Sequence, residues 1–293
     1  MSFAATDGVK LTGLLYEPKK ATTRAAVWLH GTGGSSIFTS SRTNLLAEEL
    51  VSRGIAWLPF NNRGSDFIRR MRKTSGTKSK TFFGGSTHEL IRECVFDIDG
   101  AARFLRERGY RELYLLGHST GANKVAVYDS YVRRNPYARY VLLAGGDDVG
   151  LTYEKLGARR FRNALEKARA MIKARRGDEL VPRTLFDLPL SWRAFLDMHN
   201  PDGDYNVFPF GEVLRGERLS RKPLFRHVQS LGKPSLFVYG DRDEFLGRVT
   251  ESVAVLADAI GPGGEIAVLA DADHSFTGRE AELGGLVAEW LLA

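Results

Sequence analysis

The sequence predicts an α/β fold with a mostly parallel, doubly wound sheet, in which helices cover both faces. Short apolar runs alternate with stretches of helical periodicity along most of the chain, which is typical of such sheets. Glycines follow two of the helical stretches, at Gly54 and Gly109, where helices commonly end. The chain has 293 residues, 43% of them hydrophobic, enough for one large core.

The first expected element is a hairpin. Residues 2–5 and 9–16 are its predicted strands, and Thr6-Asp7-Gly8 is the turn, because an Asp-Gly pair readily adopts positive φ. A polar and basic stretch from about residue 65 to residue 87 is predicted to be a loop. The remaining predicted strands are 25–29, 55–60, 113–116, 140–144, 234–240 and 265–269. The predicted helices are 41–53, 88–108, 119–133, 248–260 and 279–292.

The alternation is interrupted between residues 147 and 225. This segment is rich in arginine and lysine, and it is broken by Pro182, Pro189, Pro201 and Pro209. It follows a predicted strand, so we expect a helical lid over the carboxyl ends of the strands, where ligands of open α/β sheets bind. The expected division is therefore a core in two parts, residues 1–146 and 226–293, with the lid at 147–225.

The formal net charge is +7, and the basic residues gather in two stretches. They are Arg69, Arg70, Arg72, Lys73, Lys78 and Lys80, and then Arg159, Arg160, Arg162, Lys167, Arg169, Lys173, Arg175 and Arg176. No nucleic-acid-binding motif accompanies them, so we expect no nucleic-acid partner and leave an anionic small substrate open.

Several other classes of protein are not expected. No run of about 18 apolar residues predicts a membrane span, and the first residues lack the pattern of a secretory signal. Cys94 is the single cysteine, which excludes an internal disulfide and fits a cytoplasmic location. Metal-ligand spacings such as CxxC and HExxH are absent, so no metal site is predicted.

Residues 117–121 read Gly-His-Ser-Thr-Gly, between a predicted strand and a predicted helix. The order of strand, sharp turn and helix is what a nucleophile elbow needs, because the strained turn exposes the serine hydroxyl above the sheet. The flanking glycines avoid clashes with the neighbouring strand and helix. Ser119 is therefore the candidate nucleophile of a hydrolase. The alternative is a glycine-rich turn without catalytic function.

A serine hydroxyl needs a base at neutral pH. His274 is the candidate, because it lies in a loop after the last predicted strand, a position beside the elbow in a doubly wound sheet. His118 is expected to pack inside the elbow. His88 opens a predicted helix and is a candidate to line the cleft. His199 and His227 are assigned surface or capping roles.

An acid is needed to orient the histidine. Asp243 is the candidate, since it follows the strand at 234–240 by a few residues and faces the same edge of the sheet. Asp241 is the competitor, with capping of the turn as its expected role. Asp147 and Asp148, after the preceding strand, are a further alternative.

A tetrahedral oxyanion needs two backbone N–H donors. Thr120, directly after the nucleophile, is one candidate, and Thr32 in the loop His30-Gly31-Thr32-Gly33-Gly34 is the other. This loop lacks the spacing of a dinucleotide site and the Lys-Ser/Thr of a phosphate loop, so no cofactor is predicted. His30, Asn62 and Arg63 follow strands and are candidates to contact substrate or to order their loops.

Four motifs in this order resemble the α/β-hydrolase superfamily over nearly the whole chain. HGTGG resembles its oxyanion loop, GHSTG its nucleophile elbow, GDRDEF its acid loop and ADHSF its histidine loop. The resemblance implies an eight-stranded sheet with an antiparallel second strand and acyl transfer to water through an acyl-enzyme, without a cofactor.

The expected function is hydrolysis of a small carboxylic ester by Ser119, Asp243 and His274. A thioesterase, an amidase or an acyltransferase with the same triad is the alternative. A non-catalytic binding protein on this fold is less favoured, because binding has no need of all three groups.

Overall fold

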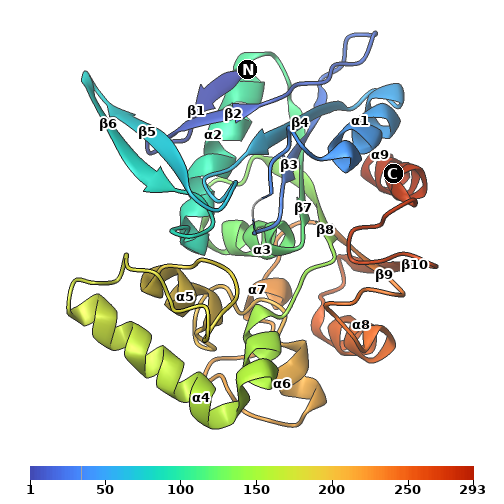
Figure 1. Cartoon of the computed structure of the whole chain (residues 1–293). Coiled ribbons are helices and arrows are strands. Elements are labelled where there is room, and N and C mark those ends of the chain that lie inside the picture. Colours follow the sequence, from blue (N-terminus) through green and yellow to red (C-terminus); the bar gives the residue numbers. More distant parts are fainter. Residues whose placement is uncertain (34) are drawn as a thin grey trace.

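A computed structural model describes residues 1–33 and 35–293, apart from the side chains of residues 41 and 42. Within them eight strands form one sheet in the order β1-β2-β4-β3-β7-β8-β9-β10 (Figure 1). The strands are β1 Ser2–Ala4, β2 Lys10–Gly13, β3 Arg24–Leu29, β4 Ala56–Asn61, β7 Glu112–His118, β8 Tyr137–Leu143, β9 Ser235–Gly240 and β10 Gly264–Leu269. Strand β2 is antiparallel to both of its neighbours. The other six strands of the sheet, β4, β3, β7, β8, β9 and β10, run parallel to one another, which confirms the predicted sheet.

Apolar side chains are buried on both faces of this sheet. Along β3, Val27 packs into one hydrophobic cluster and Ala26 and Trp28 into the other, as the alternation of side chains along a strand requires. The helices that cover the sheet are α1 Ser41–Ser52, α2 Cys94–Glu107, α3 Thr120–Tyr131, α8 Val249–Ala259 and α9 Glu280–Leu292. Helices α1 and α9 pack together on one face (Figure 1).

The predicted loop before residue 87 is wrong over most of its length. Strands β5 Arg69–Ser75 and β6 Lys78–Gly84 pair as an antiparallel hairpin that projects from the body of the protein (Figure 1). Met71 is the buried side chain of β5, while most other hairpin side chains lie in solvent, so the strands lack the apolar alternation that sequence reasoning detects. Gly76, with φ of 57°, makes the two-residue turn possible.

Residues 147–225 contain three helices, α4 Asp148–Lys173, α5 Trp192–His199 and α6 Phe210–Leu214. They gather beyond one end of the sheet, and the short helix α7 Arg226–Gln229 follows them (Figure 1). Helix α4 is interrupted at Gly157, whose φ of 72° and ψ of 157° are not helical. Glycine adopts this conformation without the steric cost that other residues meet.

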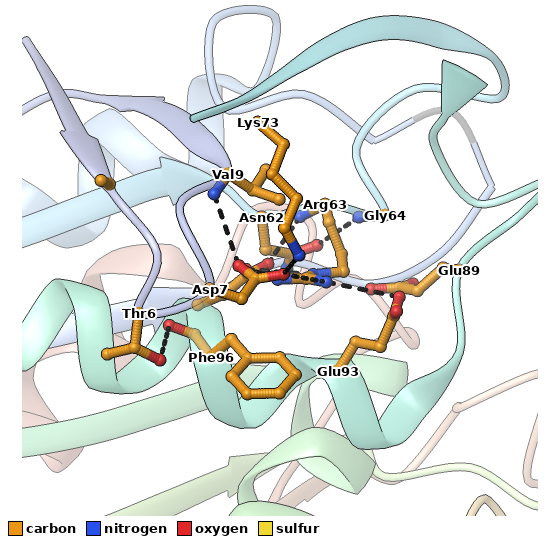
Figure 2. Close-up of polar contacts among 12 residues, drawn as sticks. Thr6, Asp7, Val9, Asn62, Arg63, Gly64, Lys73, Glu89, Glu93 and Phe96 are labelled. Atoms are coloured by element: carbon orange, nitrogen blue, oxygen red, sulfur yellow. Dashed lines mark hydrogen bonds and ion pairs between the residues drawn. The ribbon is translucent and has the colours of Figure 1, made fainter. Parts of the chain in front are cut away.

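Arg63, two residues after β4, gathers carboxylates from two separate parts of the chain. The guanidinium of Arg63 pairs with Asp97 at 2.7 Å, with Asp7 at 3.2 Å and with Glu93 at 3.4 Å. Lys73 of β5 reaches the same Asp7 carboxylate at 2.8 Å (Figure 2). These carboxylates raise the pKa of Arg63 well above its ordinary value despite the burial that opposes its charge. The cluster joins β4, β5, α2 and the turn after β1 through charges that are mutually satisfied.

His199 gives the fold an expected sensitivity to acid. Its ring is buried against Phe186 and Phe195, and burial lowers its pKa to about 4. The unfolded chain binds the proton near pH 6.5, so His199 reduces stability as the pH falls from 6.5 towards 4. Between pH 7 and pH 4.5 the variant His199→Phe is expected to lose about 2 kcal/mol less free energy of unfolding than the wild type. Urea unfolding at both pH values measures this, and equal losses in the two proteins would contradict it.

Candidate active site

The turn between β7 and α3 holds Ser119 in a strained conformation. Its φ of 56° and ψ of −127° lie outside the regions that non-glycine residues ordinarily occupy. Its backbone N–H donates to Leu143 O of β8 at 2.9 Å, which fixes the turn to the sheet. A Cβ at Gly117 would lie 2.2 Å from Gly121 O, and one at Gly121 would lie 2.2 Å from Leu29 O. Both glycines are therefore required by the close approach of strand and helix.

The structure pairs His274 with Asp243. Nδ1 of His274 lies 3.0 Å from each carboxylate oxygen of Asp243, and both residues are buried. Asp243 follows β9 and His274 follows β10, so two parallel strands deliver the pair to one edge of the sheet. The backbone N–H of His274 donates to Glu244 Oε2 at 3.1 Å, and the Phe245 ring packs 4.6 Å from the imidazole.

Two of the competing carboxylates, Asp241 and Asp147, are occupied by other contacts. Asp241 is exposed, and its Oδ1 accepts the N–H of Ala272 at 3.2 Å, a loop-capping contact of the expected kind. Asp147 caps α4 by accepting the N–H of Gly150 at 2.7 Å, and it accepts the N–H of Gly211 at 2.7 Å. Among the candidate acids within the described chain, Asp243 is the one in contact with His274.

The glycine-rich loop after β3 lies directly over the elbow. A Cβ at Gly31 would approach Ser119 Cβ to 3.0 Å, and Thr32 and Thr120 line the same cavity as Ser119. Gly34 of this loop lies outside the described residues. Thr32 and Thr120, the two predicted oxyanion donors, thus lie in the lining of the cavity that contains Ser119.

His30 and His118 support the loops around the serine. Nδ1 of His30 donates to Gly31 O at 2.7 Å, and burial, reinforced by the charge of Lys124, lowers the pKa of His30 to about 3. His30 is therefore neutral at physiological pH and lines the cavity wall. His118 Nε2 lies 2.8 Å from His274 O, and its ring packs against Trp28, which agrees with a packing role.

Ser119 and His274 open into a cavity of about 860 Å³. Helix α4 and residues 186–188 form one wall, and the loop after β3 forms another. Among the described residues that line the cavity, Lys155 is the one lysine or arginine, and it pairs with Asp187. The arginines and lysines of the β5–β6 hairpin are not among the described lining residues, so the basic stretches do not surround the serine.

Asn62 and Arg63 are not brought to this cavity. The Asn62 side-chain carbonyl accepts the N–H of Gly64 at 3.0 Å and the Lys124 ammonium at 3.3 Å, and Arg63 is held by the carboxylates described above (Figure 2). Of the three predicted substrate contacts, His30 alone lines the cavity. The structure assigns Asn62 and Arg63 to the ordering of the loop after β4, the alternative that their sequence position also allowed.

Sequence reasoning missed a buried ion pair beneath the elbow helix. Lys124 Nζ of α3 lies 2.6 Å from Glu89 Oε1, with their side chains 0% and 6% exposed. Glu89 fits because Gly64 has no side chain: a Cβ there would lie 2.0 Å from Glu89 Oε2. A lysine inside a helix and a glutamate before another carry no local signal that they will pair.

The variant Lys124→Met is expected to lower the free energy of unfolding by about 3–5 kcal/mol, because it leaves the Glu89 carboxylate buried without its partner. Adding Glu89→Gln should restore much of that loss. The matched control is Lys155→Met at the ion pair with Asp187, whose side chains are 54% and 75% exposed, where a change of under about 1 kcal/mol is expected. Chemical denaturation measures all three, and equal effects of the two lysine variants would refute the assignment.

No group of three or more histidine, cysteine, aspartate or glutamate residues in the described chain is arranged to hold a metal ion. In the same residues no helix is both long enough and apolar enough to cross a membrane.

Comparison with known proteins agrees with the fold and the motifs. The chain has no significant match among curated proteins. Among solved structures it is similar to Est1E from Butyrivibrio proteoclasticus with ferulic acid bound, at 17% identity and a TM-score of 0.63 over 99% of this chain and 97% of that one. It is also similar to the esterase EaEST from Exiguobacterium antarcticum, at 16% identity and a TM-score of 0.59 over 100% and 99% of the two chains. A third similar structure is the Pyrococcus furiosus esterase Pf2001, at 18% identity and a TM-score of 0.58 over 100% of this chain and 89% of that one.

At these low identities the structural similarity shows a shared fold and nothing further. The family comparison goes further, because the family model described as the alpha/beta hydrolase family matches residues 26–283. That range spans the loop after β3, the elbow, the Asp243 loop and the His274 loop. The chain therefore belongs to the α/β hydrolase family.

Proposed function

We propose that the protein hydrolyses small carboxylic esters through an acyl-enzyme formed on Ser119. The observation that carries the proposal is the contact of His274 Nδ1 with both Asp243 oxygens, in a cavity that His274 shares with the strained Ser119. A carboxylate on Nδ1 keeps the proton there and leaves Nε2 free to accept the serine proton. The roles of the three residues follow from this arrangement.

In the proposed reaction the Ser119 hydroxyl attacks the ester carbonyl while His274 takes its proton. The backbone N–H groups of Thr32 and Thr120 stabilise the oxyanion, each by roughly 3 kcal/mol. His274 then donates the proton to the leaving alcohol, and water attacks the acyl-enzyme with His274 again as base. Residues 147–225 act as a lid that excludes bulk water from this chemistry.

The proposed substrate is a small ester, and the case for an anionic one has weakened. The two basic stretches do not line the cavity. Among the described lining residues Lys155 carries the positive charge, and its ammonium is already paired with Asp187. A thioester, an amide or transfer to another acceptor would use the same residues. A location in the cytoplasm stays a prediction from the single cysteine.

The test combines turnover with covalent labelling. Wild-type protein is assayed on p-nitrophenyl esters of short, long and aromatic acids, and is treated with a fluorophosphonate, which reacts with activated serines. We expect turnover, and a single adduct that peptide mass spectrometry maps to Ser119. Labelling without turnover of any ester would favour a thioester, an amide or a different acceptor. A folded protein with neither would favour a binding role and reject the proposal.

A further inference from the structure

One face of helix α4 forms part of the cavity wall, and this face carries an aspartate, Asp148, at the N-terminal end of the helix. Asp148, Leu151, Thr152 and Lys155 line the cavity at positions i, i+3, i+4 and i+7, the spacing of a single helical face. Asp148 is the first residue of α4, while Lys155 lies two turns along and pairs with Asp187. The two ends of this face therefore differ in charge.

Asp148 differs from its neighbour Asp147 in its contacts. Asp147 accepts two backbone N–H groups, from Gly150 and Gly211. In the described chain Asp148 has no ion pair, and the hydrogen bond of its carboxyl group is with its own backbone rather than with another residue. His274 is the group of opposite potential charge that acts on it, but His274 is already held by Asp243. Asp148 thus presents a carboxyl group to the cavity without a committed partner.

The environment of Asp148 opposes its negative charge. Burial, and next the neighbouring Asp147 carboxylate, raise the pKa of Asp148 to about 7. A carboxylate that is partly desolvated and unpaired gains from any cation placed beside it. A neutral or anionic ligand offers no such gain, and an anionic one adds repulsion.

We propose that Asp148 is a specificity-determining residue that receives a cationic nitrogen group of the ester substrate. The proposal rests on the proposed esterase function and names its substrate class. The charge of the cavity is opposite in sign to the net charge of the chain. The chain carries +7, whereas the described charged residues that line the cavity are three acids and one base: Asp148, Asp187, Glu280 and Lys155. A carboxylate-bearing ester would meet repulsion where a cationic one meets attraction.

The test uses three p-nitrophenyl esters matched in length. They carry 5-(trimethylammonio)pentanoyl, 6,6-dimethylheptanoyl and 5-carboxypentanoyl groups, so the first two share one shape and differ by one charge. For the wild type, kcat/KM is expected to be at least about 10-fold higher for the cationic ester than for its neutral isostere, equivalent to about 1.4 kcal/mol. The anionic ester should be the slowest.

In Asp148→Asn the ratio of cationic to neutral ester should fall to about 1, whereas Asp241→Asn, at an exposed carboxylate outside the cavity lining, should keep the wild-type ratio. A wild-type ratio near 1, or a ratio unchanged in Asp148→Asn, overturns the inference and leaves the esterase function standing. Preference for the anionic ester overturns it as well.

A binding measurement makes the test independent of turnover. Hexyltrimethylammonium should bind the wild type, measured by calorimetry, and should bind Asp148→Asn at least about 10-fold more weakly. Equal binding to both proteins rejects the role of Asp148 even if no ester in the panel is hydrolysed. Failure of the esterase function is recognised separately, by the absence of turnover and of Ser119 labelling.

Discussion

Replacing Ser119 by alanine is expected to lower kcat for ester hydrolysis by about 10⁴-fold or more. Removal of the nucleophile from a serine triad leaves the binding and oxyanion contributions, and these supply a small part of the rate. The fold should survive, because Ser119 donates its backbone N–H to Leu143 O and this contact does not involve the hydroxyl. Initial rates on a p-nitrophenyl ester, with thermal unfolding of both proteins, test the expectation.

Ser275→Ala is the matched control for that substitution. Ser275 lines the same cavity and loses the same hydroxyl, but it does not lie at the strained turn. Its rate should stay within about 10-fold of the wild type. If Ser119→Ala kept most of its activity, or if both variants lost equal amounts, Ser119 could not be the nucleophile.

The parts of the site that sequence predicts are those carried by local motifs at strand ends. Gly117, Ser119 and Gly121 form a turn that few residue combinations permit, so their pattern identifies the elbow. Asp243 and His274 follow strands β9 and β10, and parallel strands place their carboxyl ends at one edge. Chain order and sheet topology were enough to bring these residues together.

Other features depend on contacts that no local pattern encodes. Arg63 also follows a strand, yet its side chain lies among Asp7, Glu93 and Asp97, because carboxylates from two segments far apart in the sequence meet there (Figure 2). The position after β4 therefore predicted its loop correctly but not the direction of its side chain. The charges of the cavity were hidden for the same reason, since the two basic stretches of the sequence contribute none of its described lining residues.

The identity of the acid is open to a direct test with two aspartates in one loop. Asp243→Asn is expected to lower kcat by about 10⁴-fold, because an asparagine side chain can donate its N–H to His274 Nδ1 and so favour the tautomer that protonates Nε2. An Nε2 that carries a proton cannot accept one from Ser119. The imidazolium formed during the reaction would also lose the carboxylate 3.0 Å from Nδ1.

Asp241→Asn makes the same chemical change two residues away, at an exposed side chain whose oxygen accepts the N–H of Ala272. The amide oxygen of asparagine can keep that contact, so kcat should change by less than about 3-fold. The pH dependence of kcat/KM separates a catalytic effect of Asp243→Asn from a structural one. A misoriented or wrongly protonated imidazole regains activity as the pH rises, because hydroxide can then take the serine proton, whereas a damaged fold does not. Comparable losses in the two variants would show that the loop, and not the Asp243 carboxylate, sets the activity.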